Sequence, residues 1–298
     1  MTSKLHEEID LKEIFLTIWG KKLTILFTTF ISTIIFLVYS LFLPNIYSSN
    51  AILYPTDKKE ALSSKIGNIS SLASFAGVDI DDKSSKTDEA LKRIKSFQFF
   101  SEYFLPNINL EDIFAIEKWL PESDSVVYDK KIFDVQNKIW QTKNNIKPSK
   151  QLAFLKYKEF LKVAEDDKSF VTLSISHQSP SIAKSWLEIV IKNINESMRE
   201  EDIDISKKSI DFLNSSSSKT NMQSLNQAIA ALQESQMQNL MFISSNEFYI
   251  FKVIDAPIAP EFKTKPDRLI ITVFGMLFGF VFSIAAILFS NSTYFKNT

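Results

Sequence analysis

The side chains that could do chemistry are few and scattered in this chain. It has two histidines, of which His6 lies near the N-terminus and His177 stands alone between an expected strand and an expected helix. The acidic pair Asp81-Asp82 lies in a polar stretch, where such pairs are most often solvated loops. Carboxylates from distant positions could still meet in space, as they do in a glycosidase. From these residues we expect no enzyme, no metal site and no bound cofactor.

Motifs that bind phosphate or zinc, or that activate a serine, are missing as well. The chain contains no HExxH, no GxSxG and no glycine-rich phosphate loop, and it has five glycines in all. It has no cysteine, which removes thiolate ligands, thiol nucleophiles and disulfides together. A net charge of −1 offers no basic surface for nucleic acid. The function must therefore come from shape, surface and location.

Location is indicated by two long apolar runs, one near each end of the chain. Leu23–Leu43 and Leu269–Phe289 each contain 21 residues without Asp, Glu, Lys or Arg. At about 1.5 Å per residue, either run spans the roughly 30 Å hydrocarbon core of a bilayer. The first run is too long for the apolar region of a signal peptide, and no small-residue cleavage site follows it. We predict transmembrane helices at 23–43 and 269–289, with residues 44–268 between them.

The charges beside the first run predict the orientation in the membrane. Lys21 and Lys22 precede it, whereas residues 44–57 contain no Lys or Arg. By the positive-inside rule, the segments 1–22 and 290–298 are then cytoplasmic, and the long middle part lies on the other side. The second run has the opposite charge pattern. We give the first run precedence because it inserts first.

Residues 9–22 place their apolar side chains on one helical face and end with Trp19, Lys21 and Lys22. This pattern is typical of an amphipathic helix that lies in the membrane surface with Trp19 at the level of the headgroups. It is equally typical of the first turns of the spanning helix. Both interpretations place these three residues at the membrane interface.

The second run contains Gly275 and Gly279, four residues apart. This spacing gives a smooth helix face for close packing inside a membrane, although it also arises by chance in many spans. We expect that the two spans pair here, or that the second span contacts another membrane protein.

The segment before the second run has the most specific spacing in the chain. It reads APIAPEFKTKPDR over residues 256–268, with Pro257, Pro260 and Pro266. Prolines hold φ near −65° and lack a backbone donor, so we expect a stiff, extended strut. Its basic side chains can meet lipid phosphates, which accounts for the reversed charge pattern. These side chains belong to Lys263, Lys265 and Arg268.

The elements between the two runs must position these motifs. Strict alternation of apolar and polar residues predicts a strand at 169–176, and further strands are expected at 46–54, which Pro55 ends, and at 247–255. Residues 57–90 are rich in Ser, Asp and Lys and predict a surface loop. Within this loop, residues 70–78 form a small apolar island that could tuck into the core or into a neighbouring subunit.

Helical spacing predicts the remaining elements. Ser179-Pro180 is an N-cap followed by proline at the first helical position, so long helices are expected over about residues 180–243, with a break at 214–218. A further helix is expected at 87–104, and short helical pieces at 106–148. We therefore predict an α+β fold, in which an α/β base domain with a long helical extension lies between two transmembrane helices.

The proline motif, together with Ile9-Asp10-Leu11, Trp19 and Lys21-Lys22, resembles the Wzz-type polysaccharide chain-length determinants, or polysaccharide co-polymerases. The resemblance runs from end to end, but residues 106–165 match nothing in the pattern. It implies a periplasmic domain in the bacterial inner membrane that assembles into a ring-like homo-oligomer. Members set the modal length of a lipid-linked polysaccharide such as the O-antigen of lipopolysaccharide, which a separate polymerase makes. Contact with the lipid-linked glycan itself is a further option.

Kinase-coupled members of that family carry a cytoplasmic nucleotide-binding domain or partner. The nine residues after Phe289 leave no room for such a domain, which favours the O-antigen class. Two other functions stay open from the residues alone. One is an inner-membrane adaptor for capsule or exopolysaccharide export, and the other is a two-span periplasmic sensor without an output domain.

Overall fold

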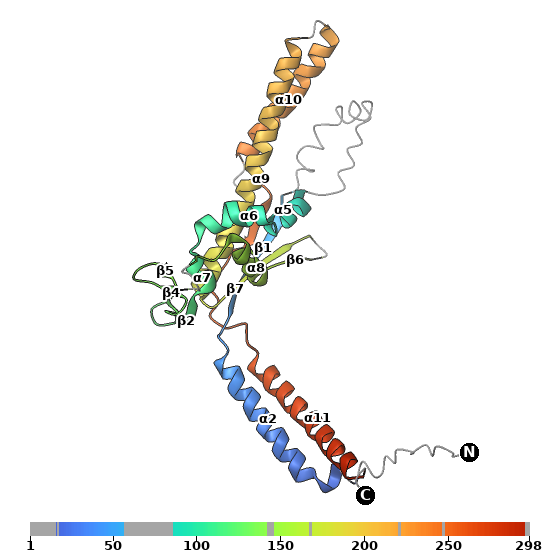
Figure 1. The fold of residues 1–298 in the computed structure, drawn as a ribbon. Helices are drawn as coiled ribbons and strands as arrows, with labels where there is room; N and C mark the ends of the chain where they lie inside the picture. The colour runs from blue at the N-terminus through green and yellow to red at the C-terminus, as the bar shows by residue number, and fades with distance from the viewer. Residues whose placement is uncertain are drawn as a thin grey trace, which may run out of the picture. The chain divides into compact units, whose positions relative to one another are not determined.

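The structure is a computed structural model, drawn as a ribbon in Figure 1. The residues that it describes are Leu16, 18–56, 86–141, 146–166, 169–219, 222–245 and 248–295, with side chains as far as Phe289. The apolar island 70–78 lies outside these residues, as do most of the predicted loop 57–90 and most of the segment 9–22.

The chain divides into two units. The first joins Met1–Ile46 to Lys263–Thr298, and the second is Tyr47–Phe262. In the first unit the two apolar runs form α2 (Lys22–Phe42) and α11 (Arg268–Phe295). Both helices are long and apolar enough to cross a membrane, α11 as far as Phe289. α11 continues beyond that apolar stretch, since no proline or glycine interrupts the sequence before its end.

A four-stranded antiparallel sheet forms the centre of the second unit. Its strand order is β6 (Leu161–Glu165), β7 (Val171–His177), β1 (Tyr47–Pro55) and β8 (Phe251–Asp255). Buried side chains alternate along β1 and β7, as expected for strands that cover a core with one face. The predicted strands at 46–54 and 169–176 are thus confirmed. β6 was not predicted, because only Leu161 of its five residues is buried and the strand therefore shows no regular alternation.

Aromatic rings pack together beside this sheet. Tyr157 lies on α8 (Lys150–Phe160), and its ring centroid is 5.1 Å from that of Phe100 and 4.8 Å from that of Phe104. The Tyr157 hydroxyl donates a hydrogen bond to the carbonyl oxygen of Ile94 at 3.0 Å, so its burial leaves no polar atom unpaired. Burial also raises the pKa of Tyr157. The second unit thus has a well-packed core.

Two long helices extend from this core as an antiparallel pair (Figure 1). α9 (Pro180–Ser217) has 38 residues, which corresponds to about 57 Å, and α10 (Gln223–Ser245) returns along it. The Ser179 hydroxyl accepts a hydrogen bond from the Ile182 N–H, as expected of an N-cap. α9 ends inside the serine run that predicted a break. The long helical extension is therefore confirmed.

The prediction of short helical pieces at 106–148 is mostly wrong. Among the described residues of this region, 106–141 and 146–148, only α7 (Leu110–Phe114) is an α-helix, and two hairpins follow it. The hairpin strands are β2 (Ile116–Leu120) with β3 (Ser125–Tyr128), and β4 (Phe133–Asp134) with β5 (Ile139–Trp140). Asp124 and Lys138 precede the returning strands with φ of 44° and 54°. This left-handed conformation closes hairpins, but neither residue is the glycine that usually signals it.

The predicted helix at 87–104 is divided by a new helix start. The pieces are α5 (Lys86–Ile94), α6 (Phe97–Phe99), a π-helical turn (Phe100–Phe104) and a 3₁₀ turn (Leu105–Asn107). The division lies at Ser96, whose hydroxyl accepts a hydrogen bond from the Phe99 N–H at 3.1 Å. A serine that caps the following turn competes with continuation of the preceding helix.

Candidate functional site

The proline motif begins in the second unit, directly after β8. Pro257 is buried and Pro260 is half-buried, and neither lies in a helix or strand. The Ser49 hydroxyl of β1 donates a hydrogen bond to the Ile258 carbonyl oxygen at 2.8 Å. The first half of the motif is therefore bonded to the first strand of the sheet.

The second half of the motif belongs to the first unit, where it pairs with the residues that follow α2. The Ile46 N–H donates to the Lys265 carbonyl oxygen at 2.9 Å, and the Ile46 carbonyl accepts from the Thr264 N–H at 2.8 Å. The Lys265 N–H also donates to the Ile46 carbonyl oxygen at 3.2 Å, so Ile46 and Lys265 form an isolated antiparallel bridge. The bond between Lys265 and Pro266 is a cis peptide. The connections to the two spanning helices are thus tied to each other.

The basic residues of the motif have different surroundings. Lys263 and Lys265 are exposed, so their ammonium groups are accessible to anions. Arg268 is half-buried, and its Nη2 donates to the Asn45 side-chain oxygen at 3.3 Å. Two of the three predicted cations are therefore free to meet phosphates, while Arg268 braces the start of α11.

The two glycines of α11 lie against α2. A Cβ atom added to Gly275 would come within 2.4 Å of the Phe36 side chain, and one added to Gly279 within 2.4 Å of Ser32 Cβ. Real Cβ atoms never approach so closely, so only glycine fits at either position. The Ser32 hydroxyl also donates to the Gly275 carbonyl oxygen at 2.8 Å. The structure thus brings the predicted packing residues to the contact between the two spans.

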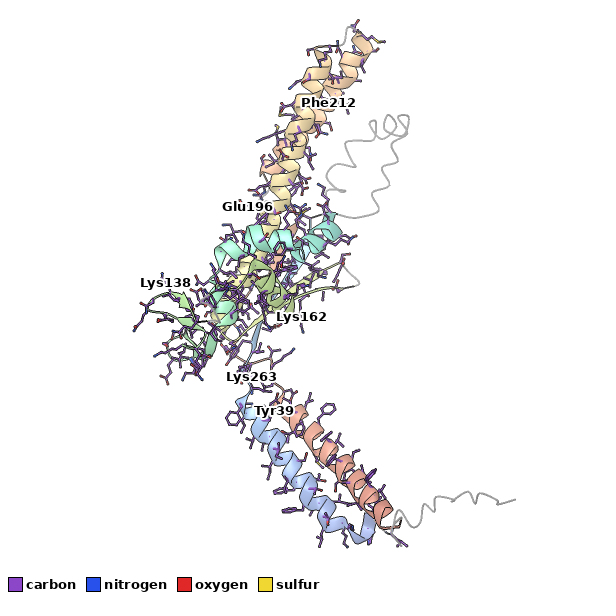
Figure 2. All side chains as sticks on the ribbon, viewed as in Figure 1. Tyr39, Lys138, Lys162, Glu196, Phe212 and Lys263 are labelled. Atoms are coloured by element: carbon purple, nitrogen blue, oxygen red, sulfur yellow. The ribbon has the colours of Figure 1, made fainter. Side chains whose placement is uncertain are left out.

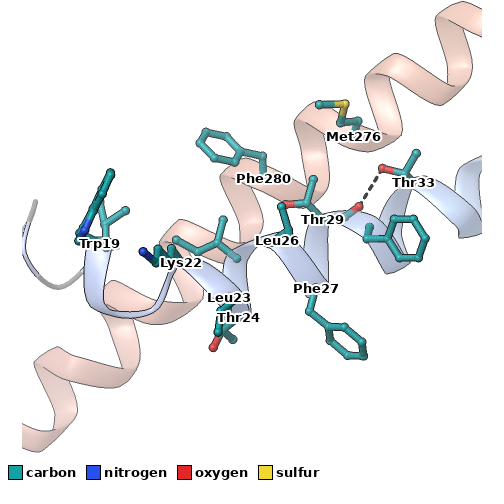
Figure 3. Close-up of a pocket in the computed structure, with 13 residues that line it drawn as sticks. Trp19, Lys22, Leu23, Thr24, Leu26, Phe27, Thr29, Thr33, Met276 and Phe280 are labelled. Atoms are coloured by element: carbon teal, nitrogen blue, oxygen red, sulfur yellow. Dashed lines mark hydrogen bonds between the residues drawn. The ribbon is translucent and has the colours of Figure 1, made fainter.

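The predicted interface residues lie at the start of α2, beside an apolar groove of about 1160 Å³ (Figure 3). The Lys22 ammonium lies 5.2 Å from the centre of the Trp19 ring, and Trp19 is 62% exposed. Figure 3 shows Met276 and Phe280 of α11 on the other side of the groove. Such a groove can hold acyl chains or the side chains of another membrane helix, with a cation at its end.

The groups that hold α9 to the sheet were not predicted from the sequence, and Asn195 makes the most hydrogen bonds among them. Its side-chain oxygen accepts hydrogen bonds from the N–H groups of Ile250 and Phe251, both at 2.9 Å. Its amide nitrogen donates to the Phe251 carbonyl oxygen at 3.3 Å. β8 begins at Phe251, so it is shorter than the predicted strand at 247–255. A polar residue on the apolar stripe of a helix was the available signal.

Charged groups surround the next turns of α9, just after Asn195. The Asp202 carboxylate accepts from the Lys86 ammonium and from the Tyr249 hydroxyl. Burial and the Asp202 charge together raise the pKa of Tyr249, so its hydroxyl stays protonated as the donor. Arg93 of α5 bonds to Glu89 at 2.8 Å and also to Glu201 of α9. These contacts orient the long helix on the base.

His177, the one histidine in the described residues, is buried where β7 leads into α9. Its Nδ1 accepts from the Ser179 N–H at 3.1 Å, so Nε2 carries the proton and donates to the Asp112 carbonyl oxygen at 3.0 Å. Burial lowers the pKa of His177. The neutral ring joins α7 to the cap of the long helix, which is a structural role.

Groups suited to a metal ion do not occur in the part of the chain that the structure describes, because no three His, Asp or Glu side chains meet there. The described residues form a pair of closely packed apolar helices, a hydrogen-bonded proline segment and a helical extension that is fixed to the base. Each of these features holds parts of the chain in a defined arrangement.

Comparison with known proteins gives one family match and several similar solved structures. A family model, "Chain length determinant protein" (Wzz), matches residues 7–111. A solved full-length bacterial polysaccharide co-polymerase is 13% identical and has a TM-score of 0.42, with 97% of this chain and 100% of that chain covered. A fragment of the polysaccharide co-polymerase WzzB from Salmonella Typhimurium is 14% identical with a TM-score of 0.31, covering 74% of this chain and 100% of its own.

At such identities and TM-scores the structural likeness carries no argument on function, and no curated protein matches the chain. The family model is independent of that likeness. It begins in the N-terminal segment and includes α2, β1 and α5. The resemblance to the Wzz-type chain-length determinants, which the sequence motifs indicated, is therefore confirmed by the family model over residues 7–111.

Proposed function

We propose that this chain sets the length of a lipid-linked surface polysaccharide, such as O-antigen, by regulating a separate polymerase without catalysing a reaction itself. The observation that carries the proposal is the match of residues 7–111 to the chain length determinant family. The two membrane-length helices at either end of the described chain support it, since a pair of spanning helices would anchor the part between them at a membrane.

The proposed location is the bacterial inner membrane, with the second unit in the periplasm. Lys21 and Lys22 support this orientation, because basic residues beside a first span are retained in the cytoplasm. Residues 1–22 and 290–298 are then cytoplasmic. Lys263 and Lys265 meet lipid phosphates on the periplasmic surface.

Self-association is part of the proposal, and the helical extension supports it. Phe212, labelled in Figure 2, is 70% exposed on α9, and Met222 next to the start of α10 is 66% exposed. Leu225 and Leu232 of α10 are more than 40% exposed. Large apolar side chains that a helical extension exposes to water can form a contact with another protein. Neighbouring copies of the extension are the partners that we propose.

Deleting the gene tests the function most directly. The lipopolysaccharide of the deletion strain is separated on a gel, and the distribution of polymer lengths is compared with that of the parent. Loss of the modal length is the result that we expect. Normal polymer length with lost surface delivery would instead identify an export adaptor, and would overturn the proposal.

The proline motif is proposed to pass the orientation of the periplasmic unit to α11. Replacing Pro257, Pro260 and Pro266 with alanine restores backbone freedom, so the length distribution should broaden while the domain stays folded. Pro121→Ala, at an exposed hairpin position, is the matched control and should leave the distribution unchanged. A distribution like that of the wild type in the triple variant would refute this role.

A further inference from the structure

A cavity of about 680 Å³ lies beside the β4–β5 hairpin, in the region whose structure differed most from prediction. One wall is formed by residues 105–111, at and before the start of α7. The hairpin contributes Phe133, Lys138 and Trp140, and residues 147–150 at the start of α8 complete the rim. The cavity lies entirely within the second unit, and its walls come from three separate parts of the chain.

The charge of this cavity is positive, although the chain as a whole carries −1. Lys138, Lys147 and Lys150 line it, while Glu111 is the only carboxylate among the lining residues. None of these lysines takes part in an ion pair between described residues. All three are exposed, and Figure 2 labels Lys138 on the hairpin. The cavity is therefore suited to an anion.

The first turn of α8 adds to this positive potential. α8 has 11 residues, and its N-cap residue Ser149 is itself part of the cavity wall. The N-terminus of a helix carries a partial positive charge from its aligned peptide dipoles. Lys150 is the first residue of the helix, so its ammonium and the helix terminus act on the same side.

The deeper part of the cavity is apolar. Phe133 and Trp140 are nearly buried, and their ring centroids are 5.0 Å apart. Leu105 and Ile108 lie beside them. An inorganic ion alone would gain nothing from such a surface. A pyranose ring has an apolar face for this floor, and an acidic substituent on the ring would lie near the lysines.

We propose that this cavity binds an acidic sugar residue, one that carries a carboxylate, within the polysaccharide. The identity of the glycan as the substrate rests on the proposed function, which this inference deepens by naming a class of sugar. Lys138, Lys147 and Lys150 bind the carboxylate, and the aromatic floor contacts the ring. The second unit then holds the growing chain directly, in addition to setting a geometry.

The test measures binding of a galacturonate hexamer to the full chain in detergent, with maltohexaose as a neutral probe of the same length. The variant K138Q/K147Q/K150Q removes the three charges. Its matched control K118Q/K162Q/K252Q removes three exposed lysines of the same unit outside the cavity. A third variant, K138R/K147R/K150R, keeps the charge.

We expect the hexamer to bind the wild type, and the cavity variant to bind it about tenfold more weakly, since three exposed ion pairs are lost. The control and the arginine variant should bind within about twofold of the wild type, and maltohexaose should bind more weakly than the hexamer. An equal loss in the cavity variant and its control would overturn the proposal, as would absence of hexamer binding.

Inorganic phosphate is the last probe, and tighter binding of phosphate than of the hexamer would also overturn the proposal by identifying a phosphate site. The binding assay needs no polymerase. If the hexamer does not bind but the deletion strain shows a changed length distribution, the sugar site is refuted and the proposed function stands.

Discussion

The molecule contains two antiparallel helix pairs that are held together in different ways. Between α2 and α11 the contact is made by Gly275 and Gly279, and a hydroxyl, that of Ser32, bonds to a backbone carbonyl. Between α9 and α10 the side-chain bonds join amides and hydroxyls, such as Gln233 with Asn214 at 2.8 Å.

The solvent explains this difference. In lipid there is no hydrophobic effect to drive apolar side chains together, so helices in a membrane associate where their backbones can approach closely. Water does drive apolar side chains together, yet only Ile229 and Ile243 are buried among the residues of α10. The pair α2–α11 is thus specified by its contact, whereas the extension depends on the groups that attach α9 to the base.

A large side chain at the glycine contact between α2 and α11 should have the largest effect on helix pairing. In Gly279→Leu the first added atom would already lie 2.4 Å from Ser32, so we expect a cost at or above the roughly 3 kcal/mol typical of severe overpacking, and loss of pairing. The chain has no cysteine, so Phe36→Cys and Phe278→Cys can report pairing through a short bis-maleimide cross-link.

Gly20→Leu is the matched control for this change. An added Cβ at Gly20 has nothing within 4 Å, so cross-linking should stay as in the wild type. Efficient cross-linking in Gly279→Leu would show that the two spans do not depend on backbone approach.

Removing the hydrogen bonds by which Asn195 holds α9 to the base should have the next largest effect. Asn195→Ala leaves two N–H groups without their acceptor in the core, at about 1–3 kcal/mol for each unpaired group. We expect a loss of about 2–3 kcal/mol, measured by urea unfolding of the detergent-solubilised chain. Asn107→Ala removes an exposed amide and should change stability by less than about 0.5 kcal/mol. Equal losses in both variants would contradict a special role for Asn195.

Acidification should weaken the attachment of α9 to the base through His177, and by a smaller amount. Burial lowers the pKa of His177 below the 6.5 of a free histidine, so the unfolded chain binds more protons between these two values. Stability is therefore full above pH 6.5 and falls below it, by at most about 1.4 kcal/mol per pH unit. Urea midpoints at pH 7.5 and 5.5 measure this fall.

His177→Gln should remove that pH-dependent component, because no group then takes up a proton at this position. His6→Gln changes the only other histidine and should keep the slope of the wild type. A slope that survives in His177→Gln would assign the acid sensitivity to carboxylates.

The smallest effect is expected from the polar contact of the membrane pair. Ser32→Ala removes the bond to the Gly275 carbonyl, and such bonds contribute about 0.6 kcal/mol in membranes. The cross-link should fall by less than about threefold. Thr28→Ala removes bonds within α2 alone and should leave pairing unchanged. A large loss in Ser32→Ala would mean that hydrogen bonding, more than close packing, holds the spans.

Local patterns predicted those parts of the fold whose cause is local. Val171, Leu173 and Ile175 alternate because one face of β7 covers the core, and Ser179-Pro180 begins α9 through a bond three residues away. The hairpins at 116–140 were missed because Asp124 and Lys138 take positive φ without being glycine. Tertiary packing decides such conformations.

The candidate site was predictable to a similar degree. The spacing of Gly275 and Gly279 indicated a contact face, but nothing in the sequence pairs it with Ser32 and Phe36 of α2. Asn195 and the Phe251 N–H that donates to its side-chain oxygen are separated by 56 residues, so no local pattern connects them. Contacts between distant segments need the folded structure.

The strand order has a consequence for how the protein is made. β1 lies between β7 and β8 in the sheet, although it is the first of the three in the chain. Ser49 pairs with Ile175, and Pro55 pairs with Phe251, so its partners are synthesised long after it. At about 5–20 residues per second, β1 is completed roughly 10–40 s before β8 emerges.

Both edges of β1 are unpaired until β7 emerges, and the edge that faces β8 stays unpaired until β8 emerges. β1 also carries apolar residues such as Ala51 and Leu53 that are fully buried in the finished sheet. Unpaired strands of this kind bind other chains readily. The folding of this domain is therefore limited by chain order as well as by stability. Nascent copies that share a membrane are most vulnerable to mispairing before β8 is in place.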